Sequence, residues 1–252
     1  MSFAHFESTL PLGAAELMRA SAFQRRMELE RDSCDDRVST RLSSLDPSLH
    51  QDLLRFEGKG RRSELLEVLA GAVRHASAVT VHLQLHQHVL ALTAFPVQRL
   101  VHAVLPMQQF LALQLTELEV LRVEKALQAP PETSIRGAAA MPEHCAPMGK
   151  VLWEFALRGA RDELLPEIAG QAAYRITPTM DLAALELSGS LASACERLKR
   201  QTTSLREIAE WPGFDRTRAM RMLNGLYLQP GLMVSRTHPA ATNESWFNNG
   251  TH

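Results

Sequence analysis

The chain has 252 residues, of which 45% are hydrophobic, and its formal net charge at pH 7 is −1. This composition predicts a globular protein with a hydrophobic core, and the length allows one large domain or two modest ones at ~100–200 residues each. A charge near zero gives the whole protein no electrostatic attraction to DNA or to anionic membranes. The three cysteines are widely spaced and predict no disulfide framework, and no apolar run approaches the ~18 residues of a membrane span. We therefore expect a cytoplasmic protein that does not bind membranes.

The first segment, residues 1–57, is polar and is predicted to be helical. Apolar residues within the range 12–30 recur near helical spacing among many charges, which predicts an amphipathic helix. Asp46 and Pro47 predict the start of a second helix, because Asp caps a first turn and Pro suits the first helical position. Gly58 is expected to end that helix.

The second segment, residues 58–127, changes from helical to strand periodicity. A helix is predicted after Ser63, where leucine and valine recur on one stripe. Polar and apolar residues then alternate from Val79 to His86, and the apolar run 89–93 follows closely, which predicts an antiparallel hairpin. The segment is therefore predicted to be an α+β domain with a small antiparallel sheet and flanking helices. Its remaining predicted elements are a strand at 99–103, a helix at 106–113 and a strand at 118–123.

Residues 128–149 contain four prolines and an alanine run, which is the composition of a linker. The following segment, residues 150–236, is predicted to be an all-α domain that ends in a winged helix-turn-helix. Helices are expected within it at 151–157, 162–169 and 191–198. Residues 237–252 are predicted to form a flexible tail.

The winged helix-turn-helix is predicted from residues 202–234. Thr or Ser at 203–204 caps a short helix, and the Pro-Gly pair at 212–213 ends it. Asp215 then caps a longer helix, over 215–228, and a strand follows after a second Pro-Gly pair. The unit is expected to bind either DNA or a protein.

The apolar residues of this longer helix that are predicted to face inward are Ala219, Met222, Leu223 and Leu226. Arg218, Arg221 and Gly225 are predicted to face outward, with Arg216 and Asn224 beside them, and Arg and Asn are groups that contact phosphates and base edges. Between residues 191 and 236 there are eight Arg or Lys against four Asp or Glu, a balance of 8 − 4 = +4. This is mildly basic and permits DNA binding, and the same arginines equally suit a surface that docks on protein. The residues expected to contact DNA or a partner are Arg216, Arg218, Arg221, Asn224, Lys199 and Arg200.

Candidate catalytic and metal-binding groups are sparse. Five of the ten histidines lie between residues 75 and 102, and a metal would bind there if anywhere. A zinc site needs three or four converging ligands, and no Cys or acid joins these histidines at ligand spacing, so we expect no metal site. The chain contains no dinucleotide fingerprint, phosphate loop, nucleophile elbow or His-Glu-x-x-His motif. We predict no catalytic residues and no cofactor.

Four runs in the α+β segment and one near the C-terminus together form a recognisable pattern. They are Leu65-Leu-Glu-Val-Leu, Val79-Thr-Val-His-Leu, Val89-Leu-Ala-Leu, Arg99-Leu-Val-His-Ala and Leu226-Tyr-Leu-Gln-Pro-Gly-Leu232. This pattern resembles the PATAN (PatA N-terminal) type of bacterial signalling domain, several members of which carry a C-terminal winged-helix unit. The resemblance implies an intracellular regulatory role, often beside response regulators or surface-motility machinery, and no catalysis.

The sequence therefore predicts a non-catalytic regulatory or adaptor protein in bacterial signalling. It would bind partner proteins through the α+β domain and the winged helix. The alternative is a transcriptional regulator that binds DNA with the helix at 215–228. The identity of the partner and the oligomeric state remain open.

Overall fold

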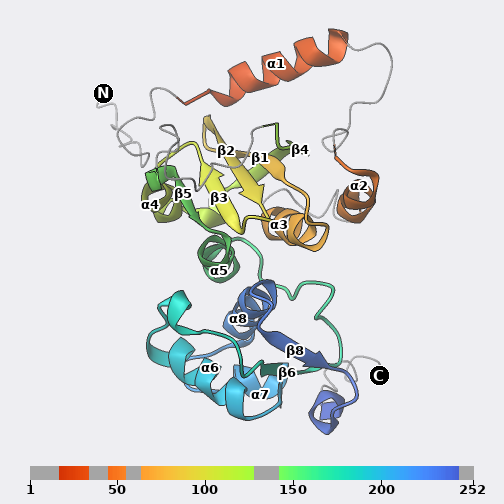
Figure 1. The fold of residues 1–252 in the computed structure, drawn as a ribbon, viewed down its shortest axis with the longest axis vertical. Helices are drawn as coiled ribbons and strands as arrows, with labels where there is room; N and C mark the ends of the chain where they lie inside the picture. The colour runs from red at the N-terminus through yellow and green to blue at the C-terminus, as the bar shows by residue number, and fades with distance from the viewer. Residues whose placement is uncertain (1–16, 34–44, 55–63, 128–141, 244–252) are drawn as a thin grey trace, which may run out of the picture. The chain divides into compact units, whose positions relative to one another are not determined.

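The structure is a computed structural model in which the chain divides into two compact units, residues 1–148 and 149–252 (Figure 1). The residues that it describes are 17–33, 45–54, 64–127 and 142–243. The predicted helix end at Gly58, the Ser63 cap and most of the predicted linker lie outside these residues. Within them, no helix has the length and apolar character needed to cross a membrane.

The first unit is built on an antiparallel sheet with the strand order β4-β1-β2-β3-β5. Its strands are β1 (Val79–Leu85), β2 (His88–Phe95), β3 (Leu100–Ala103), β4 (Glu119–Lys125) and β5 (Cys145–Pro147). The predicted hairpin is confirmed, with Val79 of β1 opposite Ala94 of β2 and Leu85 opposite His88. His86 in its turn has φ of +54°. The predicted α+β class is therefore confirmed.

Helices lie on both sides of this sheet (Figure 1). They are α1 (Ala20–Ser33), α2 (Pro47–Leu54), α3 (Glu64–Arg74) and α4 (Met107–Ala112), with short 3-10 turns η2 (Leu115–Glu117) and η3 (Pro142–His144). Burial alternates along β1, so that Val79, Val81 and Leu83 face the core while the residues between them are half-buried. On the other face, the Phe23 ring of α1 lies 5.1 Å from the imidazole of His82. The hydrophobic core thus sits on the α3 side of the sheet.

Residues 142–147 correct the linker prediction, because they form η3 and β5 rather than a connection between domains. β5 pairs with β3 and places Ala146 opposite Val101. The linker was predicted from the proline content, but one of these prolines, Pro147, lies in a strand. Pro147 lies on an edge strand of the sheet, where the missing backbone N–H costs no ladder hydrogen bond.

The second unit contains a smaller sheet with the order β7-β6-β8. Its elements are α5 (Met148–Arg158), β6 (Ala173–Ile176), η4 (Ala183–Leu185), α6 (Gly189–Arg200), β7 (Thr203–Ser204), α7 (Leu205–Ala209), α8 (Arg216–Leu228), β8 (Leu232–Ser235) and η5 (Pro239–Asn243). The predicted caps are confirmed. Ser204 and Glu207 form a capping box at α7, and the Asp215 carboxylate accepts a hydrogen bond of 2.7 Å from the backbone N–H of Arg218.

Two predictions for this unit were wrong in part. It is not all-α, because the strand β6 forms the centre of a sheet and pairs with β8 and β7. Since β6 precedes α6, the partner of β8 comes from earlier in the chain, and no hairpin follows α8 within the described residues. The helix-turn-helix order is present, but the winged helix is not confirmed.

The predicted helix at 162–169 is also absent, and the segment forms turns. Side chains satisfy its backbone instead of a helical ladder. The Arg161 guanidinium donates hydrogen bonds to the carbonyls of Glu163 and Leu164, and Asn224 on α8 bonds to Glu163 and Leu165. A buried backbone group needs a partner, and here the partners are side chains.

The close contact of α8 with α5 makes Gly225 intolerant of a larger residue. A Cβ added at Gly225 would lie 2.5 Å from Cε3 of Trp153, which real Cβ atoms essentially never approach. We expect Gly225→Ala to lower the free energy of unfolding by about 1–3 kcal/mol through overpacking. Urea denaturation followed by circular dichroism measures the effect. In a Trp153→Leu background the same substitution should cost less, whereas stabilisation in the native background would contradict this packing.

Candidate functional site

The helix α8 is enclosed on two sides within its own unit. The apolar residues predicted to face inward are confirmed as buried, with Met222 and Leu226 0% exposed. Gly225, which was predicted to face outward, is buried as well, because Trp153 and Ala156 of α5 pack against it. The C-terminal part of the predicted binding face of α8 is therefore covered by α5.

Asn224 was predicted to contact DNA or a partner, and this prediction was wrong. Its side chain is 0% exposed. The amide nitrogen donates a 2.9 Å hydrogen bond to the carbonyl of Glu163, and the amide oxygen accepts a 2.8 Å bond from the backbone N–H of Leu165. Asn224 thus holds the turn segment after α5 against α8, with both its amide nitrogen and its amide oxygen bonded to that segment.

Arg221 is also engaged inside the unit. Its Nε donates to the carbonyl of Arg161 at 3.2 Å and its Nη1 donates to the carbonyl of Leu157 at 3.4 Å. A guanidinium near the last turn of α5 satisfies carbonyls that the helix leaves without a partner. The side chain is half-buried, so the predicted role in binding an outside molecule is replaced by a role in holding α5.

The other predicted contact residues lie at the ends of α8 and α6. Arg216 and Arg218 are exposed at the start of α8, and Arg200 is exposed at the end of α6. Lys199 is half-buried, with its Nζ 4.0 Å from a carboxylate oxygen of Glu196. Arg216 and Arg218 thus lie beside the turn between α7 and α8 rather than at the middle of α8.

At that turn, two arginines stack on two aromatic rings. The Arg218 guanidinium lies 5.2 Å from the centroid of Phe214, and Arg197 of α6 lies 4.6 Å from that of Trp211. The rings of Trp211 and Phe214 meet edge to face at 6.5 Å. We name Arg197, Trp211, Phe214 and Arg218 the arginine–aromatic cluster. Sequence reasoning missed Arg197, because only the fold brings it to Trp211.

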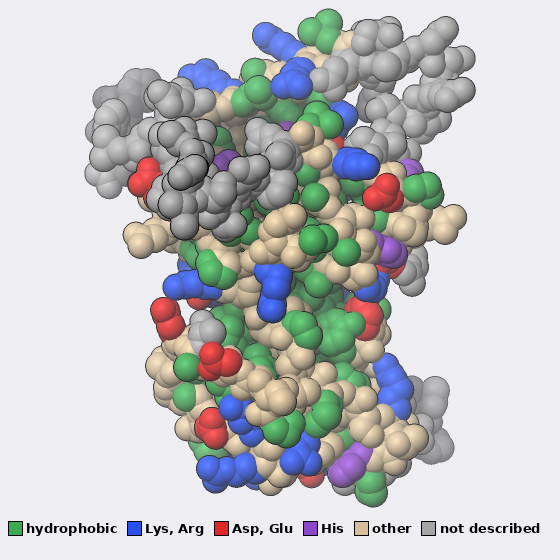
Figure 2. Space-filling view, viewed as in Figure 1, with side chains coloured by type: hydrophobic (Ala, Val, Ile, Leu, Met, Phe, Trp, Pro, Cys, Tyr) green, Lys and Arg blue, Asp and Glu red, His purple; other side chains and the backbone are tan. Residues whose placement is uncertain are grey.

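Neither arginine of this cluster has a carboxylate of the described residues within ion-pair distance. Among the described residues of the second unit, Lys150, Arg158 and Arg206 each lie within 4.0 Å of a carboxylate, and neither Arg197 nor Arg218 does. Figure 2 shows Lys and Arg side chains interspersed with acidic ones over this unit. An exposed guanidinium without a carboxylate partner keeps donors for an outside acceptor.

The histidines at 75–102 do not converge in the first unit. Four of the five face different partners: His75 faces Asp52, His82 faces Glu124, His86 faces Glu117, and His102 stacks with His144. Within the described residues, no group of three or more ligand-type side chains is placed to hold a metal ion.

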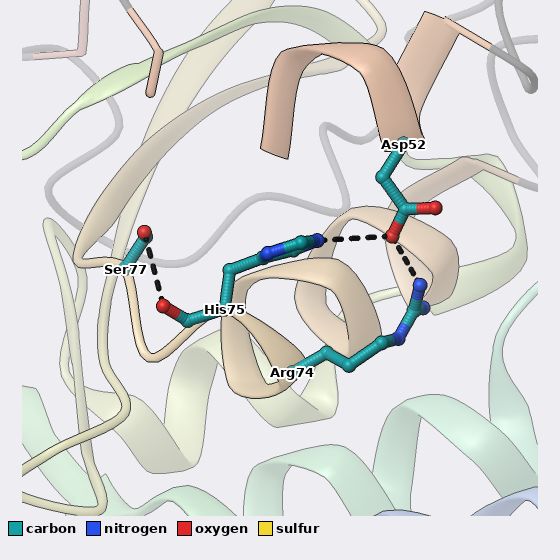
Figure 3. Close-up of polar contacts among 4 residues, drawn as sticks. All are labelled: Asp52, Arg74, His75 and Ser77. Carbon is teal, nitrogen blue, oxygen red and sulfur yellow. Dashed lines mark hydrogen bonds and ion pairs between the residues drawn. The ribbon is translucent and has the colours of Figure 1, made fainter. Parts of the chain in front are cut away.

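A shallow hollow of about 380 Å³ lies between α2 and α3. Figure 3 shows Asp52 of α2 pointing toward Arg74 and His75 at the end of α3. The carboxylate is 5% exposed and binds the Arg74 guanidinium and, at 3.3 Å, the His75 ring. The Ser77 hydroxyl donates to the backbone carbonyl of His75 and not to its ring, so these groups form no serine–histidine–aspartate relay. The cluster fastens α2 to α3.

Comparison of the chain with protein-family models, with curated proteins and with solved structures finds no match in any of the three.

Because Asn224 is structural, its loss should affect folding first. We expect Asn224→Ala to lower the free energy of unfolding by about 1–3 kcal/mol, since it leaves the backbone groups of Glu163 and Leu165 without their partner. Chemical denaturation checks this, with Arg200→Ala at an exposed position as the control. An unchanged stability with a selective loss of ligand binding would contradict the assignment.

The stability of the first unit should fall in mild acid because of His102. Burial, and secondly the charge of His144, lower the pKa of His102 below its ordinary value of 6.5. The unfolded chain then binds a proton more readily than the folded chain, so stability is greatest above pH 6.5 and declines as the pH falls toward the folded pKa. Urea midpoints between pH 7.5 and 5 should fall less steeply for His102→Gln. Equal slopes for both proteins would contradict the prediction.

Proposed function

We propose that this protein is a non-catalytic regulatory or adaptor protein of intracellular bacterial signalling, which works by binding partner proteins. The observation that carries the proposal is that Arg221 and Asn224, in the middle of the predicted binding face of α8, are engaged within their own unit. A helix that reads DNA places several side chains against base edges in the major groove. In this chain, Asn224 and Arg221 bind the backbone of their own unit instead.

Two further features support an adaptor. The first unit has the order of helix, hairpin and strand on which the resemblance to PATAN-type signalling domains rests. The chain as a whole has a net charge of −1 and offers no general attraction to nucleic acid. The exposed turn between α7 and α8, with Pro212 and Gly213 at its tip, provides a surface on which a partner protein can dock.

A second candidate function is DNA-binding transcriptional regulation. It is favoured by one observation, the exposure of Arg216 and Arg218 at the N-terminal end of α8. Helix-turn-helix proteins contact bases mainly with the N-terminal residues of the second helix. This candidate requires the remaining contacts to be made with phosphates alone, by cations such as Arg200.

Affinity capture and a mobility shift, performed side by side, separate the two candidates. The tagged full-length chain should recover a specific protein from a lysate of the native host, and that protein, once purified, should bind the chain directly. Genomic DNA fragments at low salt should show no shift. A salt-dependent shift that Arg216→Ala with Arg218→Ala abolishes, together with no direct protein partner, would establish the DNA-binding alternative instead.

A further inference from the structure

We propose that the arginine–aromatic cluster binds a short acidic segment of a partner protein, with carboxylates paired to Arg197 and Arg218. The proposal rests on the adaptor function and adds the place and the chemistry of the contact. Both side chains are exposed, and neither forms an ion pair among the residues that the structure describes. The cluster thus offers two guanidinium groups with no carboxylate of the described residues within 4.0 Å.

The two guanidinium groups are held in place before any partner arrives. Each lies close enough to its ring centroid for a cation–π contact, and Nη1 of Arg218 also donates a 2.8 Å hydrogen bond to the carbonyl of Gly213. Trp211, beneath Arg197, is only 7% exposed and is therefore a fixed support. An arginine restrained in this way loses less conformational entropy on binding than a free one.

The turn that carries the cluster is itself fastened to α6. Gly213 has φ of +77°, in the region that favours glycine, and a Cβ there would lie 3.0 Å from Cβ of Ser190. The backbone of the turn therefore passes close to the start of α6, the helix that also carries Arg197. As a result, the spacing between Arg197 and Arg218 is set by packing between helices.

Carboxylates fit the remaining donors of these side chains. A guanidinium has five N–H groups in a planar fork, which matches a carboxylate in bidentate geometry. An arginine lies over each ring and Trp211 is buried, so the cluster presents guanidinium groups rather than the open aromatic platform on which nucleic-acid bases stack. The chemistry of the cluster is therefore that of a receptor for two acidic side chains.

The surrounding charges favour a short acidic segment over a DNA duplex. Residues 196–218 contain six Arg or Lys and four Asp or Glu, a balance of 6 − 4 = +2. Glu210 and Asp215 are exposed beside the turn. A duplex brings one negative charge per ~1.7 Å of axis and would meet these acids, whereas a short segment needs carboxylates only opposite Arg197 and Arg218.

Fluorescence anisotropy with a labelled hexaglutamate peptide tests the proposal on the full-length chain. The native protein should bind hexaglutamate at 50 mM NaCl, and hexaglutamine should not bind. Arg197→Gln with Arg218→Gln should weaken hexaglutamate binding about tenfold. A control with the same loss of charge, Lys150→Gln with Arg158→Gln, removes cations that are paired with Glu186 and Glu154 and should bind like the native protein. A labelled 20-base-pair duplex serves as the competing probe.

Further variants cover loss of folding and separate failure here from failure of the adaptor function. Arg197→Gln alone removes only the stacking contact on Trp211, and it should still weaken binding if the double variant does not fold. Reversal of both charges to Glu should transfer binding to hexalysine. Equal hexaglutamate binding by native and double-variant protein, or tighter binding of the duplex, overturns the proposal. If a captured partner binds the native protein and the double variant equally, the proposed contact at the arginine–aromatic cluster is overturned, and the adaptor function is not.

Discussion

The contact between Gly225 of α8 and the indole of Trp153 of α5 is the constraint on which the second unit depends. Only a residue without a Cβ lets the helix approach the ring this closely, and the approach brings α5 against α8 at Gly225. Once α5 is there, its last carbonyls lie within reach of Arg221, and the turn that follows lies within reach of Asn224. Arg221 and Asn224, which an isolated helix would expose, therefore form hydrogen bonds within the unit.

Because of this packing, the exposed arginines lie at the turn before α8 and not along the middle of the helix. Trp211 and Phe214 support one arginine each there, one from α6 and one from α8 itself. Such a surface is compact and mixed in charge, because acids lie on both sides of the turn. Its size and sign suit a partner with a few acidic groups better than a continuous polyanion.

In the first unit, the hairpin of β1 and β2 was predictable because a strand with one buried face alternates strictly and because its partner follows after a short turn. β5 was not, since a strand of three residues has no period to detect and its partner β3 lies more than forty residues earlier, as the pairing of Val101 with Ala146 shows. The pairing of β5 with β3 also brings His144 and Cys145 next to His102, which the sequence did not predict. His82, His86 and His102 are close in sequence but contact different partners, which are Glu124, Glu117 and the His144 ring.

By itself, the sequence determined the features that act over a few residues: the caps at Ser204 and Asp215, the break at the Pro-Gly pair, and the buried stripe of α8. Capping bonds and apolar periodicity are local, so they can be read without knowing the fold. Only the tertiary structure decided that α8 has a second buried face and that Arg197 stacks on Trp211. Whether a polar side chain faces water or a neighbour depends on which distant segment covers it, and no local pattern records that.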